Sequence, residues 1–375
     1  VALRGALALD PTRYLVSVIA GSGDRLLDEA ATAGLEVMVE PCLRSPLAPR
    51  DDVRALRHLA ALISGGRFDV VHTHCAKAGT LGRLAAHRAH VPRIVHTYHG
   101  FPFHEFQSSL RRATYVEIER RLGRFTDVAL CVGTGVAVEA IRRGLVAPER
   151  VRTIGVTVDG NAATRTPESR RRARRALGVP ENALVVGAVG RLAYQKAPQD
   201  FVDALRRIAR PDVVGVWVGD GELADEVRQA VRLAAPRTQV ILAGERPDVT
   251  DLLPAFDVFA LPSRYEGLPV AIVEAMVAGV PVVATAVNAV SDVVVPGVTG
   301  LLVPPARPDL LATAVTYLLD HQDEAAAMAT AARRHVSSTH SPAALGRVLA
   351  DAYDPAAPTP SKRWKAIAAR EQACA

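Results

Sequence analysis

Short apolar runs alternate with helical patterns along nearly the whole chain. Residues 184–189, 213–218 and 258–261 have the length of buried strands, and stretches with helical spacing of apolar residues separate them. Consecutive strands joined through a helix lie parallel, because the helix carries the chain back to the edge where the first strand began. The alternation therefore predicts an α/β protein with parallel sheets.

The individual apolar runs place the strands. In the first half of the chain we expect strands at 14–20, 35–39, 68–73, 94–98, 128–132 and 151–156. In the second half we expect them at 184–189, 213–218, 239–243, 258–261, 282–284 and 301–303. The same arrangement thus occurs twice, which predicts two Rossmann-like, doubly wound domains facing each other across a cleft.

The length of 375 residues also favours two domains, because one hydrophobic core rarely supports so long a chain. We expect an N-terminal domain at 1–155, a linker and the first helix of the second domain at 156–180, a C-terminal domain at 181–340, and a helix and tail at 341–375. Residues 1–9 resemble the end of a helix, whereas a doubly wound domain should open with a strand. We therefore expect the first strand of the N-terminal domain to be missing.

Composition and charge limit the class of partner and the compartment. The formal net charge of +6 favours anionic partners such as nucleotide diphosphates, anionic lipid surfaces or nucleic acid, and does not choose among them. The four cysteines are scattered, which argues against a zinc site or a disulfide framework and favours a reducing compartment, the cytoplasm. With no apolar run of about eighteen residues and no signal-peptide pattern, we expect a chain that is soluble or peripherally attached to a membrane.

One charged loop follows the first strand of the second domain. Gly190 leaves room for the backbone to approach a ligand, Arg191 offers a bidentate fork, and Lys196 offers a movable point charge. Ligands of open α/β sheets bind at the carboxyl ends of the strands, so this loop is a candidate clamp for a diphosphate. A surface loop with two solvated cations explains the same residues equally well.

A second segment precedes an almost wholly apolar helix. Pro269 suits the first helical position, which would place the amides of Gly267 and Leu268 at a helix N-terminus, a natural anion site. Glu266 stands before this helix and Glu274 lies inside it, where a carboxylate needs partners such as sugar hydroxyls. In the alternative interpretation Glu266 only complements the helix dipole and Glu274 faces water.

These motifs together resemble the donor-site motifs of glycosyltransferase family 4, a family with the GT-B fold that retains anomeric configuration. The motif Gly219-Asp220-Gly221 and the segments 279–284 and 296–300 also occur in the order and spacing of that family, so the resemblance covers nearly the whole chain. Ala197-Pro198 departs from it, because many members have a glycine after the lysine.

The resemblance implies a role for each matching residue. Arg191 and Lys196 would hold the donor diphosphate, Glu266 the hydroxyls of the transferred sugar, and Glu274 the ribose. Gly190, Gly267 and Leu268 would bring backbone close to the phosphate and sugar. The resemblance also implies front-face attack without a protein nucleophile, and the leaving phosphate oxygen would take the acceptor proton. We expect neither a metal nor another cofactor, only a nucleotide-diphosphate sugar as donor.

Histidines follow two strands of the first domain. His99 stands before Gly100 and resembles the first-domain histidine with which the family contacts the donor sugar, although an ordinary loop histidine is a close alternative. We take His99, Glu266, Arg191 and Lys196 as the candidate catalytic residues. His72 and His74 share a strand face, but no third ligand has a telling spacing, so no metal site is expected.

The sequence constrains the acceptor and the pathway less than it constrains the donor site. Arginines interleaved with apolar residues at 110–125 could face an anionic membrane, as a lipid-linked acceptor would need, or could form a solvated helix face. We expect sugar transfer to a sugar, lipid-linked or small-molecule acceptor in polysaccharide, glycolipid or natural-product glycoside biosynthesis, without a nucleic acid partner. The alternatives are a nucleotide-sugar 2-epimerase of the same fold and a catalytically weak nucleotide-binding homologue. An NAD-dependent oxidoreductase is disfavoured, because no Gly-x-Gly-x-x-Gly follows a strand.

Overall fold

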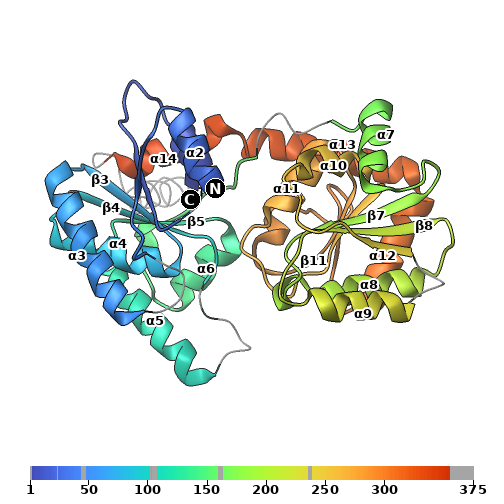
Figure 1. The fold of residues 1–375 in the computed structure, drawn as a ribbon, viewed down its shortest axis with the longest axis horizontal. Coiled ribbons are helices and arrows are strands. Elements are labelled where there is room, and N and C mark those ends of the chain that lie inside the picture. Colours follow the sequence, from blue (N-terminus) through green and yellow to red (C-terminus); the bar gives the residue numbers. More distant parts are fainter. Residues whose placement is uncertain are drawn as a thin grey trace, which may run out of the picture. The chain divides into compact units, whose positions relative to one another are not determined.

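A computed structural model describes residues 2–22, 24–43, 48–101, 103, 108–158, 164–234 and 239–354, and the tail from 355 onward lies outside the described residues. The chain divides into two compact units (Figure 1). The first unit comprises residues 1–155 and 342–375, and the second comprises residues 156–341. The C-terminal helix therefore belongs to the first unit, although it follows the second in sequence.

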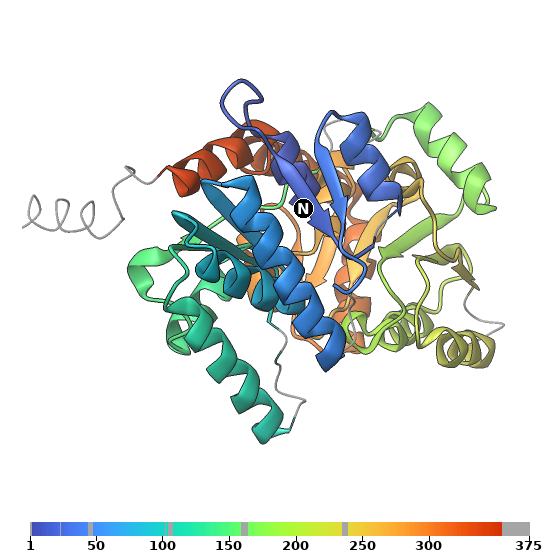
Figure 2. The same ribbon diagram turned by 60° about the vertical axis from the view of Figure 1, so that its left-hand side comes forward.

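The first unit carries two parallel sheets, one of two strands in the order β1-β2 and one of four in the order β3-β4-β5-β6. Its elements are α1 (Ala2–Leu7), β1 (Ser17–Ala20), α2 (Asp24–Thr32), β2 (Glu36–Val39), α3 (Pro49–Gly66), β3 (Val70–His74), α4 (Ala76–Arg88), β4 (Arg93–Tyr98), α5 (Ser109–Gly123), β5 (Val128–Cys131), α6 (Thr134–Arg142), η1 (Pro148–Arg150), β6 (Val151–Thr153) and α14 (Pro342–Tyr353). Helix α14 lies beside α1, as Figures 1 and 2 both show. A Cβ on Gly346 would lie 2.3 Å from the carbonyl oxygen of Ala8, so this close contact requires a glycine at position 346.

The second unit is built on one six-stranded parallel sheet in the order β12-β11-β10-β7-β8-β9. Its elements are α7 (Pro167–Leu177), β7 (Leu184–Val189), η2 (Tyr194–Lys196), α8 (Pro198–Ile208), β8 (Val213–Val218), α9 (Ala224–Ala234), β9 (Gln239–Leu242), α10 (Val249–Leu252), η3 (Leu253–Ala255), β10 (Val258–Leu261), α11 (Val270–Ala278), β11 (Val282–Thr285), η4 (Asn288–Asp292), β12 (Leu301–Val303), α12 (Pro308–Asp320) and α13 (Gln322–Thr339). Strands β7, β8, β10 and β12 have the bounds that the apolar runs predict.

The strand order fixes where this unit can bind a ligand. From β7 the sheet grows first through β8 and β9 on one side and then through β10, β11 and β12 on the other. This is the doubly wound Rossmann order, whose switch point lies between β7 and β10. The crevice at the carboxyl ends of these two strands is the position where such sheets bind their ligands.

Local sequence explains how the second unit begins. Thr166 caps helix α7, because its hydroxyl accepts a hydrogen bond from the Ser169 amide at 3.1 Å while the Ser169 hydroxyl accepts one from the Thr166 amide at 2.8 Å. Pro167 occupies the first helical position, and Gly178 ends the helix with a φ of 67°. The predicted first helix of the second domain is therefore present, and it carries the arginines discussed below.

Candidate active site

The charged loop after β7 is held against the end of β8. The Gly190 amide donates to the Val218 carbonyl at 3.0 Å, and the Trp217 indole donates to the Gly190 carbonyl at 2.8 Å. A Cβ on Gly219, whose φ is 132°, would lie 2.2 Å from that same carbonyl oxygen. The glycines of Gly219-Asp220-Gly221 therefore let the loops after β7 and β8 approach each other closely.

Lys196 and Glu266, which belong to different motifs in the sequence, meet in the structure. Lys196 Nζ lies 2.5 Å from Glu266 Oε1, and the exposed fractions of the two side chains are 16% and 5%. The Ser263 hydroxyl donates to the same carboxylate oxygen at 2.6 Å, and the side-chain amide of Gln195 donates to Glu266 Oε2 at 3.2 Å. The arrangement is a buried, hydrogen-bonded ion pair at the carboxyl ends of β7 and β10.

Backbone contacts join the loops that carry this pair. The Arg264 amide donates to the Gln195 carbonyl at 2.8 Å, and the Thr285 hydroxyl donates to the Ser263 carbonyl at 2.6 Å. The Glu266 amide donates to Asn288 Oδ1 at 3.1 Å. Sequence reasoning missed Gln195, Ser263 and Asn288, because their contacts join segments that are far apart in the chain.

Arg191 is exposed and follows β7 in the same loop as Lys196. Burial raises the pKa of the Tyr265 phenol, and the positive charge of Arg191 opposes that shift. The charge of Arg191 therefore reaches Tyr265, the residue that precedes Glu266. That Arg191 and Lys196 serve one site stays a prediction.

Helix α11 begins one residue later than the sequence predicts. Pro269 has a ψ of 114° and stands at the N-cap, and Val270 is the first helical residue. The prediction that Pro269 is the first helical residue is therefore wrong by one position. Proline is compatible with both the N-cap and the first turn, so the residue type alone does not distinguish them. Gly267 and the buried Leu268 still immediately precede this N-terminus, and Glu274 is partly buried in the helix.

In the first unit, His99 follows β4 and pairs with His74. The His74 Nδ1 and His99 Nε2 atoms are 2.9 Å apart, and burial lowers the pKa of His99 to about 4. His72 instead contacts the Tyr353 hydroxyl and the Thr97 hydroxyl, each at 2.7 Å. Within the part of the chain that the structure describes, no group of three or more His, Cys, Asp or Glu side chains could hold a metal ion.

Helix α5, in teal in Figure 2, carries the basic segment. Leu110 and Ile118 are exposed by 79% and 38%, and several arginines between and beyond them are exposed as well. The other face of the helix is anchored, because Glu119 is buried against Arg83 at 2.8 Å. None of the helices in the described ranges is long and apolar enough to cross a membrane.

Comparison with known proteins identifies the class of this chain. The family model "Glycosyltransferase Family 4" matches residues 2–161, and the model "Glycosyl transferases group 1" matches residues 169–335. The D-inositol 3-phosphate glycosyltransferase of Thermobispora bispora is 32% identical over 78% of this chain and 72% of its own length. The chain belongs to glycosyltransferase family 4.

Two further comparisons concern a relative and the fold. An Escherichia coli UDP-Gal:alpha-D-GlcNAc-diphosphoundecaprenol alpha-1,3-galactosyltransferase is 34% identical over 63% of this chain, and the match spans 62% of that protein, less than two thirds. The structure of Anabaena HepE in complex with UDP and glucose superposes with a TM-score of 0.81 at 23% identity, covering 93% of this chain and 94% of that one. The family-4 chain therefore has the GT-B fold with two Rossmann-like domains, as the sequence predicts.

Proposed function

We propose that this family-4 glycosyltransferase moves a hexose from a UDP-sugar to an acceptor hydroxyl with retention of anomeric configuration. The observation that carries the proposal is the pairing of Lys196 and Glu266 at the switch point of the second unit, with Arg191 in the same loop as Lys196. The name of the Escherichia coli relative supports a UDP-sugar donor, and so does the UDP in the HepE structure.

The charges of the site suit a sugar diphosphate. An ammonium group has three donors, so Lys196 can keep its contact with Glu266 and still donate to phosphate oxygens. Arg191 would add a bidentate contact, and the amides before helix α11 would point at the same anion. Cations and amides positioned in this way stabilise the negative charge that accumulates on the leaving diphosphate.

Glu266 and Glu274 are proposed to hold the two sugar rings of the donor. Each oxygen of a carboxylate has two lone pairs, so the Glu266 Oε2 atom, bonded by Gln195, can accept a further hydrogen bond from a hydroxyl. Glu274 would accept from the ribose. Retention would then follow from front-face attack in which the leaving phosphate takes the acceptor proton, without a covalent intermediate and without a metal.

A lipid-linked acceptor is the proposed partner, and it would place the protein at the cytoplasmic face of a membrane. The acceptor in the name of the Escherichia coli relative is lipid-linked. On helix α5 the exposed Leu110 and Ile118 stand among exposed arginines, a combination that suits an anionic lipid surface. We assign the reaction to glycolipid or polysaccharide assembly on these grounds.

A transfer assay tests the proposal. UDP-galactose, UDP-glucose and UDP-GlcNAc are offered with a GlcNAc-diphosphate lipid, and the anomeric proton coupling of the product is read by NMR. The proposal predicts transfer with an α linkage, abolished in Lys196→Ala. A β-linked product would contradict retention, and an isomerised donor without any acceptor would favour the 2-epimerase.

A further inference from the structure

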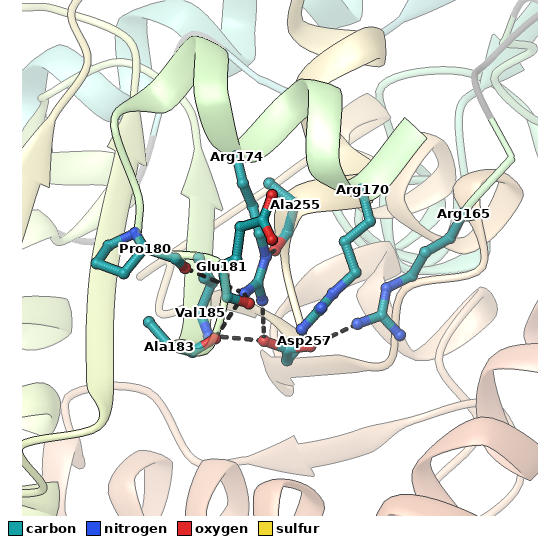
Figure 3. Close-up of polar contacts among 9 residues, drawn as sticks. All are labelled: Arg165, Arg170, Arg174, Pro180, Glu181, Ala183, Val185, Ala255 and Asp257. Atoms are coloured by element: carbon teal, nitrogen blue, oxygen red, sulfur yellow. Dashed lines mark hydrogen bonds and ion pairs between the residues drawn. The ribbon is translucent and has the colours of Figure 1, made fainter. Parts of the chain in front are cut away.

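Asp257, at the amino end of β10, forms ion pairs with three arginines (Figure 3). Arg165 Nη2 and Arg170 Nη2 donate to Asp257 Oδ1 at 2.5 and 3.0 Å. Arg174 Nη2 donates to Oδ2 at 2.7 Å, and the Val185 amide donates to the same oxygen at 2.8 Å. A single carboxylate therefore faces three guanidinium groups.

The three arginines differ in how far their donors are used. Arg174 is fully buried, and its other donors reach the carbonyls of Pro180, Glu181, Ala183 and Ala255, as Figure 3 shows. Arg174 is thus a structural residue. The Nε–H groups of Arg165 and Arg170 are buried and have no hydrogen-bond partner among the described residues. A buried donor without a partner is unfavourable, so this end of the cluster has unused capacity for an acceptor.

A cavity of about 550 Å³ opens beside Arg165 and Asp257, within the volume range of small-molecule sites. Its walls combine apolar residues at the ends of α11 and α12 with Gln322, Asp323 and Thr330 of α13. Thr164 and Arg333 also line the cavity, and Arg333 Nη2 donates to the Thr164 hydroxyl at 3.1 Å. The side chains of Arg165 and Arg170 keep exposed fractions of 29% and 32%, so both can turn toward a ligand.

Two arginines, Arg165 and Arg333, line this cavity together with the carboxylates of Asp257 and Asp323. Arg170 and Arg174, which lie outside the cavity lining, also contact Asp257 and add two positive charges behind it. Burial lowers the pKa of the Arg165 guanidinium, Asp257 opposes this shift, and the charge of Arg170 adds to it. An anion bound at Arg165 would offset the repulsion between Arg165 and Arg170.

The cavity is separate from the candidate donor site. Its lining includes Leu184 at the start of β7, Asp257 before β10 and Pro281 before β11. These residues lie at the amino ends of parallel strands, whereas Lys196 and Glu266 follow the carboxyl ends of β7 and β10. The two sites therefore occupy opposite edges of one sheet, and the inference goes beyond the proposed transferase reaction.

We propose that this cavity binds a phosphate-bearing small molecule, with its phosphate between Arg165 and Arg333. Guanidinium groups pair with phosphate oxygens through two parallel hydrogen bonds, and the buried Nε–H of Arg165 has no partner among the described residues. The volume beyond one phosphate leaves room for the remainder of a phosphorylated sugar against the apolar part of the walls.

Titration calorimetry with inorganic phosphate and with glucose 6-phosphate, in saturating UDP, tests the proposal on the full chain. Wild type should bind at least one of the two probes, and Arg165→Gln and Arg333→Gln should each weaken that binding about tenfold or more. Tighter binding of glucose 6-phosphate would identify a phosphorylated sugar as the ligand, and equal binding would identify the free anion. Arg172→Gln is the matched control, because it removes the same charge from an exposed position of α7 and should leave binding unchanged.

Two results would overturn the proposal. One is the absence of any heat from either probe in wild type, and the other is unchanged binding in both variants. Because Arg165 also contacts Asp257, Arg165→Gln could fail to fold. Arg333→Gln then decides alone, since Arg333 is exposed and its described hydrogen bond goes to the Thr164 hydroxyl.

Discussion

Replacing Lys196 with alanine should cost stability as well as donor binding. The Lys196 and Glu266 side chains are only 16% and 5% exposed and lie 2.5 Å apart, so the substitution leaves a carboxylate buried without its cation. Breaking a buried ion pair from one side typically costs about 3–5 kcal/mol. Because Lys196 keeps some contact with water, we expect a value near the lower end, about 3 kcal/mol.

The assay is urea denaturation followed by tryptophan fluorescence. Trp217 is buried in β8, and replacing Trp364 with phenylalanine makes Trp217 the only tryptophan of the chain, so the signal reports on the second unit. Glu266→Gln should also lower the free energy of unfolding. Because the two side chains interact, the double variant should be destabilised by less than the sum of the two single substitutions, and the difference should be at least about 1 kcal/mol. Arg191→Ala is the control, since it removes an exposed cation and should change stability by no more than about 0.5 kcal/mol.

The argument for a buried ion pair would be refuted by two outcomes. A loss below about 1 kcal/mol in Lys196→Ala would mean that water or another cation replaces the lysine at little cost. Strict additivity of the two substitutions would mean that the two side chains do not interact.

Three more outcomes follow from the structure. Ala197 has a φ of 50° before Pro198, so Ala197→Gly should raise the unfolding free energy by up to about 1 kcal/mol in urea titrations, and a loss would show that the left-handed conformation is not strained. Burial lowers the pKa of His99 to about 4, below the roughly 6.5 of an exposed histidine. In this pH range the unfolded chain binds a proton that the folded chain does not, so the free energy of unfolding should fall as pH drops from about 6.5 toward 4. His99→Asn should make this dependence on pH shallower. A pH dependence equal to that of wild type would contradict the burial of His99. Transfer activity should survive EDTA in the assay buffer, and a loss restored by Mg²⁺ would show that a metal shares the charge stabilisation assigned to Arg191 and Lys196.

Sequence reasoning located the strands well because each buried strand is a local apolar run. The bounds of β7, β8, β10 and β12 follow from such runs alone. The sheet order does not, because pairing β10 with β7 joins segments separated by two strands in the chain. The membership of α14 in the first unit likewise depends on a distant contact, the close approach of Gly346 to Ala8.

The candidate site was predictable in its cations and carboxylates but not in its connections. Arg191, Lys196 and Glu266 stand out because charged residues follow buried strands. The buried pairing of Lys196 with Glu266 spans seventy residues and needs the tertiary fold. Asn288 gave no signal in the sequence, because a single polar residue after a strand is common and its contact with the Glu266 amide is a tertiary one.

Calorimetric titration with UDP, GDP and dTDP tests most directly the claim that the second unit binds a nucleotide sugar at its switch point. We predict micromolar binding of UDP by wild type, weakened at least about tenfold in Lys196→Ala and in Glu274→Ala. Glu324→Ala is a matched exposed control on α13 and should bind as wild type. Absence of binding to all three nucleotides, or binding that neither site substitution changes, would contradict the assignment of the donor site.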